Sequence, residues 1–288
     1  MIDKIDLVMW TRNGAKTLPH VLKRIGQVVP SEHVASRIIV DDGSTDQTRE
    51  IAQRFGWRVV QNRGSGISDG ANTALDLVTT EWFASFEQDV LLSADWWPKI
   101  PSLLSRPEVA VASGLRFPSQ PVGLMKLEEY QAERYSRGGT ELDAETYGKT
   151  LDNTVYKTSV LRRLGGFPNP PVPAGIDTAL NHMLKRSNLK WMVDYSVRSL
   201  HIREGFREEL RHYFWYAQCV DVLSQIQTGK PYPLRNLYRR TLLSPARGLQ
   251  IALKQKAPQI IYVYPLVRLA YLRGIAASRR RAAKAEKR

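Results

Sequence analysis

The chain reads Ile38-Ile39-Val40-Asp41-Asp42-Gly43-Ser44-Thr45-Asp46 at a point where an apolar run stops at two aspartates. β-Branched residues favour a strand, whereas Asp, Gly and Ser directly after it are typical of a turn that leads into a helix. We therefore predict a strand that ends at Val40. A helix from Thr45 to Phe55 should follow, with Ser44 or Thr45 as its N-cap.

The same alternation of strand and helix continues on both sides of this stretch. Apolar runs predict further strands over residues 5–10, 57–61 and 82–86, and helical spacing predicts helices over 16–27 and 68–78. Strands that alternate with helices at this spacing imply an open parallel sheet with right-handed crossovers. The predicted fold class is therefore α/β. Towards the C-terminus we expect helices over 178–186 and 206–225 and a strand over 190–200.

Polar side chains follow three of the predicted strands, at the points where those strands end. In open α/β sheets, ligands bind beyond the carboxyl ends of the strands. The residues at these ends are Thr11, Arg12 and Asn13; Asp41 and Asp42; and Glu87, Gln88 and Asp89. Acidic side chains gathered at one edge are costly unless a cation or a hydrogen-bonding ligand compensates them. A divalent metal together with a phosphorylated ligand would do so.

Composition limits the class of protein further. The chain has 288 residues, of which 43% are hydrophobic and 24% charged, so it can bury a substantial core and is not a disordered or fibrous protein. Its one cysteine, Cys219, cannot form an intramolecular disulfide or a thiolate metal site. No run of about 18 uninterrupted apolar residues and no signal-like N-terminus are present. We therefore expect a cytoplasmic chain that does not span a membrane.

The net charge of +14 is concentrated at the C-terminal end. Residues 233–288 contain fourteen Lys and Arg and one acidic residue, Glu286, which leaves 28 basic and 27 acidic residues elsewhere. We predict two domains, a nearly neutral α/β domain over 1–220, for which the motifs below imply nucleotide-sugar binding and catalysis, and a basic amphipathic helical region over 221–288. The alternation of leucine with arginine suits a helix on an anionic membrane surface. An ordinary helical subdomain is the second reading, and nucleic-acid binding is a weaker third.

Taken in order, the motifs resemble those of family 2 glycosyltransferases, a group of inverting enzymes with the GT-A fold. The matching motifs are Thr11-Arg12-Asn13-Gly14, Asp41-Asp42-Gly43-Ser44, Ala71-Asn72, Glu87-Gln88-Asp89 at the D-x-D position, Gly165-Gly166-Phe167-Pro168, Gly175-Ile176-Asp177 and His201. The resemblance covers roughly residues 4–220. It implies a Rossmann-like open sheet with flanking helices, to which the chain adds the basic helical extension.

The resemblance also implies roles for individual residues. The nucleotide-sugar-binding set would be Thr11, Arg12, Asn13, Asp41, Asp42, Asn72, Glu87 and Gln88. Asp89 would hold Mn²⁺ or Mg²⁺, with His201 completing the metal shell, because hard divalent ions take carboxylate oxygens and bridge substrate phosphates. Asp177 would be the general base. Glu87 departs from the usual first Asp of the D-x-D motif, and Ile176 from the usual acidic residue before the base.

The implied activity is metal-dependent transfer of a hexose, with inversion, from a nucleoside diphosphate sugar to a hydroxyl group. A UDP-type donor and a saccharide or lipid-linked acceptor at the cytoplasmic membrane face are favoured, which suggests glycan biosynthesis. No Arg-Trp dipeptide occurs, so the Q-x-x-R-W motif of processive synthases is absent. The alternatives are a nucleotidyltransferase and a non-catalytic glycosyltransferase-like binding protein.

Three further segments are secondary candidates for contact with a ligand. The loop Arg63-Gly64-Ser65-Gly66 is a secondary candidate for nucleotide contact, and residues 117–150 are a candidate lid. The rings of Tyr213, Phe214, Trp215 and Tyr216 either floor an acceptor pocket or pack on the body of the protein, and packing is favoured for most of them.

Overall fold

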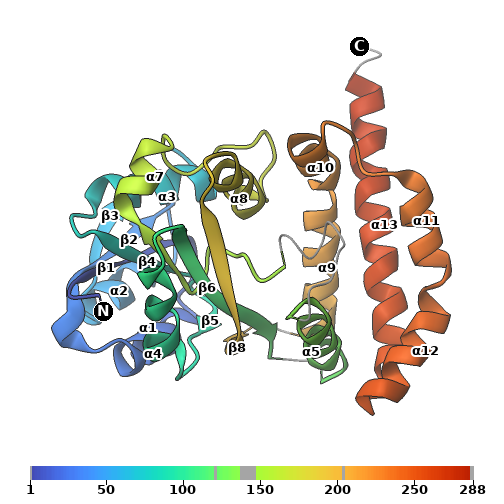
Figure 1. The fold of residues 1–288 in the computed structure, drawn as a ribbon, viewed down its shortest axis with the longest axis horizontal. Helices are drawn as coiled ribbons and strands as arrows, with labels where there is room; N and C mark the ends of the chain where they lie inside the picture. Colours follow the sequence, from blue (N-terminus) through green and yellow to red (C-terminus); the bar gives the residue numbers. More distant parts are fainter. Residues whose placement is uncertain (1, 120–121, 137–146, 203–204, 286–288) are drawn as a thin grey trace. The chain divides into compact units, whose positions relative to one another are not determined.

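The computed structural model describes residues 2–119, 122–136, 147–202 and 205–285, and it consists of two compact units (Figure 1). The first unit comprises Met1–Phe117, Glu141–Asn169 and Ile176–Ile202. The second comprises Pro118–Thr140, Pro170–Gly175 and Arg203–Arg288. The boundary predicted after residue 220 falls inside the second unit. The division into a domain over 1–220 and a helical region over 221–288 stays a prediction.

The first unit is built on a sheet whose strands lie in the order β3-β2-β1-β4-β7-β6-β8-β5. The strands are β1 Ile5–Thr11, β2 Val34–Asp41, β3 Arg58–Gln61, β4 Trp82–Phe86, β5 Val90–Leu91, β6 Val109–Pro118, β7 Thr154–Lys157 and β8 Lys190–His201. β1 to β4 run parallel, as the sequence predicts. β7 is antiparallel to both β4 and β6, and β5 is antiparallel to β8, so the expectation of a parallel sheet is wrong for this half.

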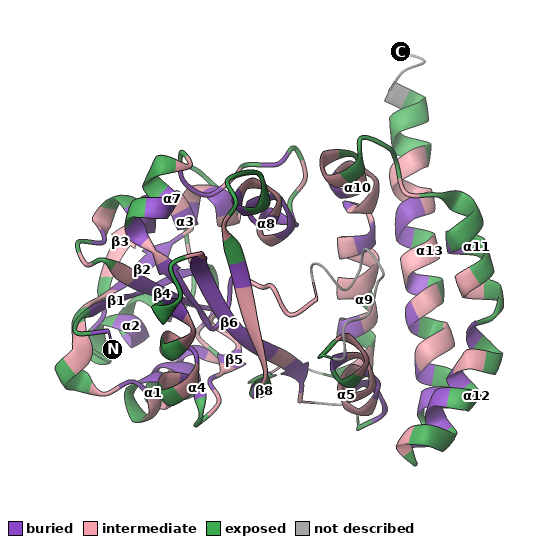
Figure 2. Ribbon diagram, in the orientation of Figure 1, coloured by how far each residue is buried: buried purple, intermediate pink, exposed green. Residues whose placement is uncertain are grey.

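Helices cover both faces of this sheet. They are α1 Leu18–Val28, α2 Thr48–Arg54, α3 Gly66–Leu77, α4 Trp96–Lys99, α7 Thr158–Arg163 and α8 Ile176–Arg186, with 3₁₀ turns at Ser31–His33 and Pro101–Ser105. Successive side chains of a strand point to opposite faces. Leu7 and Met9 of β1 accordingly pack with the buried face of α1, whereas Val8 and Trp10 pack with α3 and α8. Figure 2 shows the buried residues concentrated in these strands.

Two helices begin elsewhere than the sequence predicts. α2 starts at Thr48, with Gln47 at the N-cap, and neither Ser44 nor Thr45 caps it. The Ser44 hydroxyl instead accepts the amide of Asn13 at 2.9 Å, and the Asp46 carboxylate accepts the amide of Thr48 at 3.0 Å. α8 starts at Ile176, two residues before the predicted helix, so Asp177 lies in its first turn.

The second unit is helical. It contains α5 Val122–Ser136, α9 Gly205–Ala217, α10 Val220–Thr228, α11 Leu234–Leu242, α12 Ser244–Gln255 and α13 Ile260–Ala285. The helix predicted over 206–225 is two helices, because tight turns end the first one at Gln218 and Cys219. Tyr213 packs in a core that α5, α12 and α13 share, so the packing interpretation holds for this ring. Much of the candidate lid, residues 137–146, lies outside the described residues.

One helix of the described chain, Ile260–Lys284, is long and apolar enough to cross a membrane by length and composition, because an 18-residue stretch of it has a mean hydropathy of 1.3. This finding does not test the expectation that the chain does not span a membrane, which stays a prediction. That expectation rests on the absence of a long run of uninterrupted apolar residues. The criterion therefore passes over α13, whose apolar stretch contains Pro265 and Arg268. Core helices of soluble proteins can be equally long and apolar. In α13, 28% of the 18-residue apolar stretch is buried.

Candidate functional site

The predicted site residues meet at the carboxyl edge of the parallel strands. The strand register pairs Thr11 of β1 with Asp41 of β2, and Asp41 with Gln61 of β3. Met9 of β1 pairs with Phe86, the last residue of β4. Residues 87–89, which follow β4, therefore lie at the same edge of the sheet as the end of β1.

The loop after β1 is fixed by Gln88. The Gln88 side chain accepts a hydrogen bond from the Thr11 hydroxyl and another from the Arg12 amide at 3.1 Å, and its own amide donates to the Arg12 carbonyl at 3.2 Å. Gly14 lies so close that a Cβ atom there would stand 2.7 Å from Gln88 Oε1. Gln88 thus holds the first loop in place from the neighbouring strand end.

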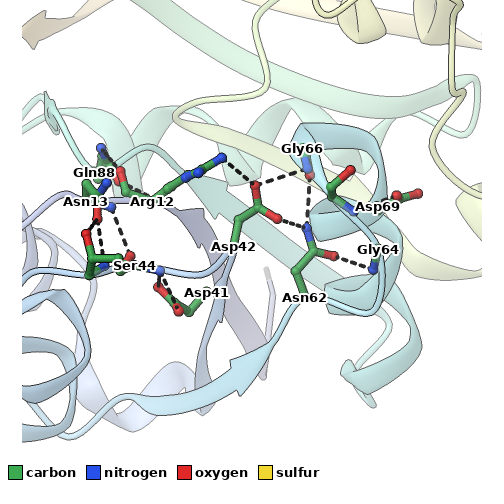
Figure 3. A network of polar contacts seen from close by, with 12 residues as sticks. Arg12, Asn13, Asp41, Asp42, Ser44, Asn62, Gly64, Gly66, Asp69 and Gln88 are labelled. Carbon is green, nitrogen blue, oxygen red and sulfur yellow. Dashed lines mark hydrogen bonds and ion pairs between the residues drawn. The ribbon is translucent and has the colours of Figure 1, made fainter.

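Asn13 joins the same loop to the one after β2. It adopts a left-handed backbone with φ of 50°, which asparagine tolerates better than most residues. Its amide donates to the Ser44 hydroxyl, and its side-chain oxygen accepts the Thr45 amide at 2.9 Å. Figure 3 shows this junction between the two loops. The side-chain oxygen of Asn13 is therefore already used inside the protein.

The two aspartates of the quoted stretch differ in their surroundings. Asp41 is buried, and its carboxylate accepts bonds from Arg49 Nε at 2.6 Å and from the Ser44 amide at 3.1 Å. Asp42 keeps 18% of its side chain exposed and lies 3.9 Å from the Arg12 guanidinium. Asp42 is therefore the one placed at the surface of the site.

Asp42 also holds the loop between β3 and α3. Its carboxylate accepts the side-chain amide of Asn62 at 2.8 Å and the backbone amide of Gly66 at 3.1 Å (Figure 3). Arg63, the basic residue of this loop, pairs instead with Asp76 at 2.6 Å. The loop reaches the site through the Gly66 backbone, and sequence reasoning missed Asn62.

Glu87, Asp89 and His201 form a group that could hold a metal ion. One ligand atom from each lies within 4.8 Å of the others, and His201 Nε2 is 2.9 Å from Asp89 Oδ2. The pairing of Val90 with His201 between β5 and β8 creates this contact. Two carboxylates and an imidazole suit a divalent cation such as Mn²⁺ or Mg²⁺. The chemistry of these donors therefore fits the predicted metal, and Glu87 belongs to the group despite its departure from the usual motif.

Arg116 of β6 lies among the acids of the site and was not predicted. Its guanidinium is 3.0 Å from Asp152, whose side chain is fully buried, and 3.3 Å from Glu87. Burial alone would lower the pKa of Arg116, but the nearby carboxylates, Asp152 foremost, raise it. A lone charge in the otherwise apolar run 109–118 was the signal that could have revealed this buried ion pair.

Asp177 lies partly buried in the first turn of α8. Burial raises its pKa to about 6, the Thr178 amide and Arg116 lower it, and the charge of Asp152 raises it. A carboxylate with a pKa near the working pH is suited to accept a proton. The role of Asp177 as the base stays a prediction, with which this raised pKa agrees.

Asn72 of α3 holds the Gly165-Gly166-Phe167 turn. Its side-chain amide donates to the Phe167 carbonyl at 2.9 Å, and its side-chain oxygen accepts the Phe167 amide at 2.8 Å. The two predicted motifs thus lie together, and the Asn72 side chain is engaged by backbone on both sides. Nucleotide contact by Asn72 stays a prediction.

Together, the sheet order and the helices on both faces define a fold of the GT-A type. The mannosyltransferase PcManGT from Pyrobaculum calidifontis, solved with GDP-Man and Mn²⁺, is similar at a TM-score of 0.61 and 19% identity, over 99% of this chain and 79% of that one. Glucosyl-3-phosphoglycerate synthase from Mycobacterium tuberculosis was solved with Mn²⁺, UDP and glucosyl-3-phosphoglycerate. It is similar at a TM-score of 0.55 and 16% identity, over 80% of this chain and 81% of that one. These likenesses show the fold.

The chain belongs to glycosyl transferase family 2, whose sequence profile matches residues 6–165. This span contains the strand-end motifs, Arg116, Asp152 and the first glycine of the Gly165-Gly166-Phe167 turn. Asp177 and His201 lie beyond it. A search of the curated proteins finds no match.

Proposed function

We propose that the protein is a metal-dependent, inverting glycosyltransferase that moves a hexose from a nucleoside diphosphate sugar to a hydroxyl group. One observation carries the proposal: Glu87, Asp89 and His201 converge at the carboxyl edge of the sheet in a member of family 2. The same structural unit holds Asp177 with its raised pKa. The neighbours solved with GDP-Man and with UDP and Mn²⁺ support a nucleotide-sugar donor.

The residues of the strand-end loops would bind the donor nucleotide. Asp42 is exposed enough to accept hydrogen bonds from a base or ribose, and Arg12 beside it carries a charge that suits phosphate. Glu87, Asp89 and His201 would hold the metal. The ion, when bound, supplies positive charge that neutralises the leaving diphosphate. Hydrogen bonds within the protein fix the conformation of these loops; they involve Thr11, Asn13, Asp41 and Gln88.

Asp177 would act on the acceptor. Its carboxylate takes the proton of the acceptor hydroxyl while that oxygen forms a bond to the anomeric carbon, and the bond from this carbon to the diphosphate oxygen breaks. Attack from the face opposite the leaving group inverts the anomeric centre. Arg116 would balance the negative charges of Glu87 and Asp152 beside the reacting groups, because its guanidinium lies 3.3 Å from the first carboxylate and 3.0 Å from the second.

We further propose that the acceptor is a saccharide or a lipid-linked saccharide, and that the protein works on the cytoplasmic face of a membrane in glycan biosynthesis. The fourteen basic residues among 233–288 support attachment to an anionic surface. A UDP-type donor is preferred, although the neighbours include one with a guanine nucleotide.

The proposal is tested by incubating the purified chain with UDP-glucose or GDP-mannose and a panel of saccharide acceptors, with Mn²⁺ and with EDTA, and measuring release of nucleoside diphosphate. We expect Mn²⁺-dependent release that Asp177→Asn abolishes, and NMR of the glycoside formed should show an inverted anomeric configuration. Nucleotide binding without release would instead identify a binding protein. Pyrophosphate formed from a nucleoside triphosphate and a sugar phosphate would identify a nucleotidyltransferase.

A further inference from the structure

The second unit exposes an unusual number of large apolar side chains. Ten of the thirteen such side chains found exposed among the described residues lie between Leu234 and Leu269. Leu242 and Leu253 are 81% and 73% exposed. The group is Leu234, Tyr238, Leu242 and Leu243 with α11, Leu249 and Leu253 of α12, and Ile261, Tyr262, Leu266 and Leu269 of α13. We call these ten residues the exposed apolar set.

The spacing of this set is helical. In α11 its members recur every four residues, at Leu234, Tyr238 and Leu242, which places them on one face. Leu237, on another face of the same helix, is buried in the core of the unit. The helix therefore has one apolar face for the core and a second that faces outwards.

The other two helices show the same division. Ile251 of α12 and Val263 of α13 are buried in the shared core, whereas Leu253 and Tyr262 point outwards. Soluble helices normally present polar side chains on the outward face, and a large exposed apolar area marks a surface for lipid or protein. Figures 1 and 2 show α11 and α12 beside α13, with exposed residues along them.

The charge around the exposed apolar set selects lipid as the occupant. Residues 222–285 contain no aspartate or glutamate and thirteen lysines and arginines. Arg235 and Arg239 are exposed on α11 next to its apolar face, and Lys256 is exposed at the end of α12, whereas the neighbouring Lys254 pairs with Glu133 of α5 at 4.0 Å. Leucine and tyrosine bordered by arginine and lysine suit the boundary between acyl chains and anionic headgroups.

The C-terminal half of α13 is fixed to the second unit and is therefore poorly suited to leave it for a membrane core. Arg279 makes two bonds of 2.6 Å to Asp221 of α10 and a third to the Tyr232 carbonyl. A Cβ atom at Gly274 would lie 2.4 Å from the Phe214 carbonyl oxygen, so α13 and α9 pack backbone against backbone. Crossing a bilayer would break these contacts and bring Arg268 and Arg273 into hydrocarbon.

We propose that the exposed apolar set docks the protein on an anionic lipid bilayer, with α11, α12 and the N-terminal half of α13 in the headgroup region and no helix across the membrane. This inference rests on the membrane location proposed above and deepens it. It does not depend on sugar transfer, because every residue proposed to bind the nucleotide or the metal, or to act as the base, lies in the first unit.

The test is flotation of the full-length chain with vesicles of phosphatidylcholine alone or mixed with phosphatidylglycerol. We expect binding to the mixed vesicles, weaker binding at high salt, and release from the membrane by alkaline carbonate. The double variant Leu242→Glu/Leu253→Glu should bind at least about 10-fold more weakly, because two apolar contacts are lost and two negative charges face the lipid. Phe55→Glu, an exposed apolar residue of the first unit, is the matched control and should bind normally.

Circular dichroism and thermal unfolding of each variant show whether it is folded, and the two leucines are exposed enough for the substitutions to be tolerated. Three results would overturn the proposal. Equal binding by the double variant would place the lipid contact elsewhere, and resistance to carbonate would identify a spanning helix. A dimer that the double variant dissociates, without vesicle binding, would show that a second copy covers this surface. Nucleotide binding measured on the same samples separates failure of docking from failure of the proposed enzyme function.

Discussion

At the scale of single residues, Asp177 makes the sharpest prediction about pH. Burial raises its pKa to about 6, so the carboxylate is protonated below that value and can accept no proton. We expect kcat/KM for sugar transfer to fall about tenfold for each pH unit below 6 and to level off above it. Asp177→Asn should remove the activity at every pH. A profile without an ionisation near 6, or an active Asn variant, would contradict the assignment.

Arg116 makes a prediction about stability. It is the cation nearest to buried Asp152, and breaking a buried ion pair from one side leaves an uncompensated charge. We expect Arg116→Met to lower the free energy of unfolding by about 3–5 kcal/mol, measured by urea denaturation. Adding Asp152→Asn should restore much of the loss, because the orphaned charge is removed. If Arg116→Met alone unfolds like the native chain, the pair does not stabilise the fold.

At the scale of elements, the turn after α7 depends on its second glycine. Gly165 and Gly166 have φ of 87° and 92°, a region that other residues enter at a cost of about 1–2 kcal/mol. A Cβ atom at Gly166 would lie 2.4 Å from Asn72 Oδ1, whereas one at Gly165 would meet nothing within 4 Å. Gly166→Ala should therefore lower the thermal midpoint more than Gly165→Ala does. Equal effects would show that backbone strain alone matters at this turn.

The elements also show which parts of the fold the sequence could predict. β1 to β4 were predicted within a few residues, because each is a short apolar run that ends at a polar turn. The antiparallel half could not be read in the same way, because the pairing of β4 with β7 joins residues about seventy positions apart. The start of α2 was missed because Ser44 is used by Asn13 instead of by the helix.

The residues of the candidate site also fall into those that the sequence could predict and those that it could not. Asp89 and His201 were proposed together from the ordered motifs, and the pairing of β5 with β8 places them in contact. Arg116, Asp152 and Asn62 were missed, because their roles come from neighbours that are distant in sequence. The single charged residue in the apolar run of β6 was the local sign of one of them.

At the scale of the whole molecule, the candidate catalytic residues and the exposed apolar set belong to different units. We therefore expect the two activities to be separable by mutation. Asp89→Ala should abolish metal-dependent nucleotide binding and leave vesicle flotation unchanged. Leu242→Glu/Leu253→Glu should weaken vesicle binding and leave metal-dependent nucleotide binding unchanged. Loss of both properties in either folded variant would mean that the units depend on each other.

The most direct measurement is the thermal stabilisation of the chain by UDP and by GDP, with Mn²⁺ and with EDTA. A ligand that binds the native state at 100 times its Kd adds about 2.7 kcal/mol of stability. We predict that one nucleotide raises the Tm only with Mn²⁺, and that Asp89→Ala and His201→Ala lose this effect. Asp95→Ala, which removes an exposed acid paired with Lys99, should keep it. The same rise in Tm with EDTA, or in Asp89→Ala, would contradict the metal site on which the proposed function depends.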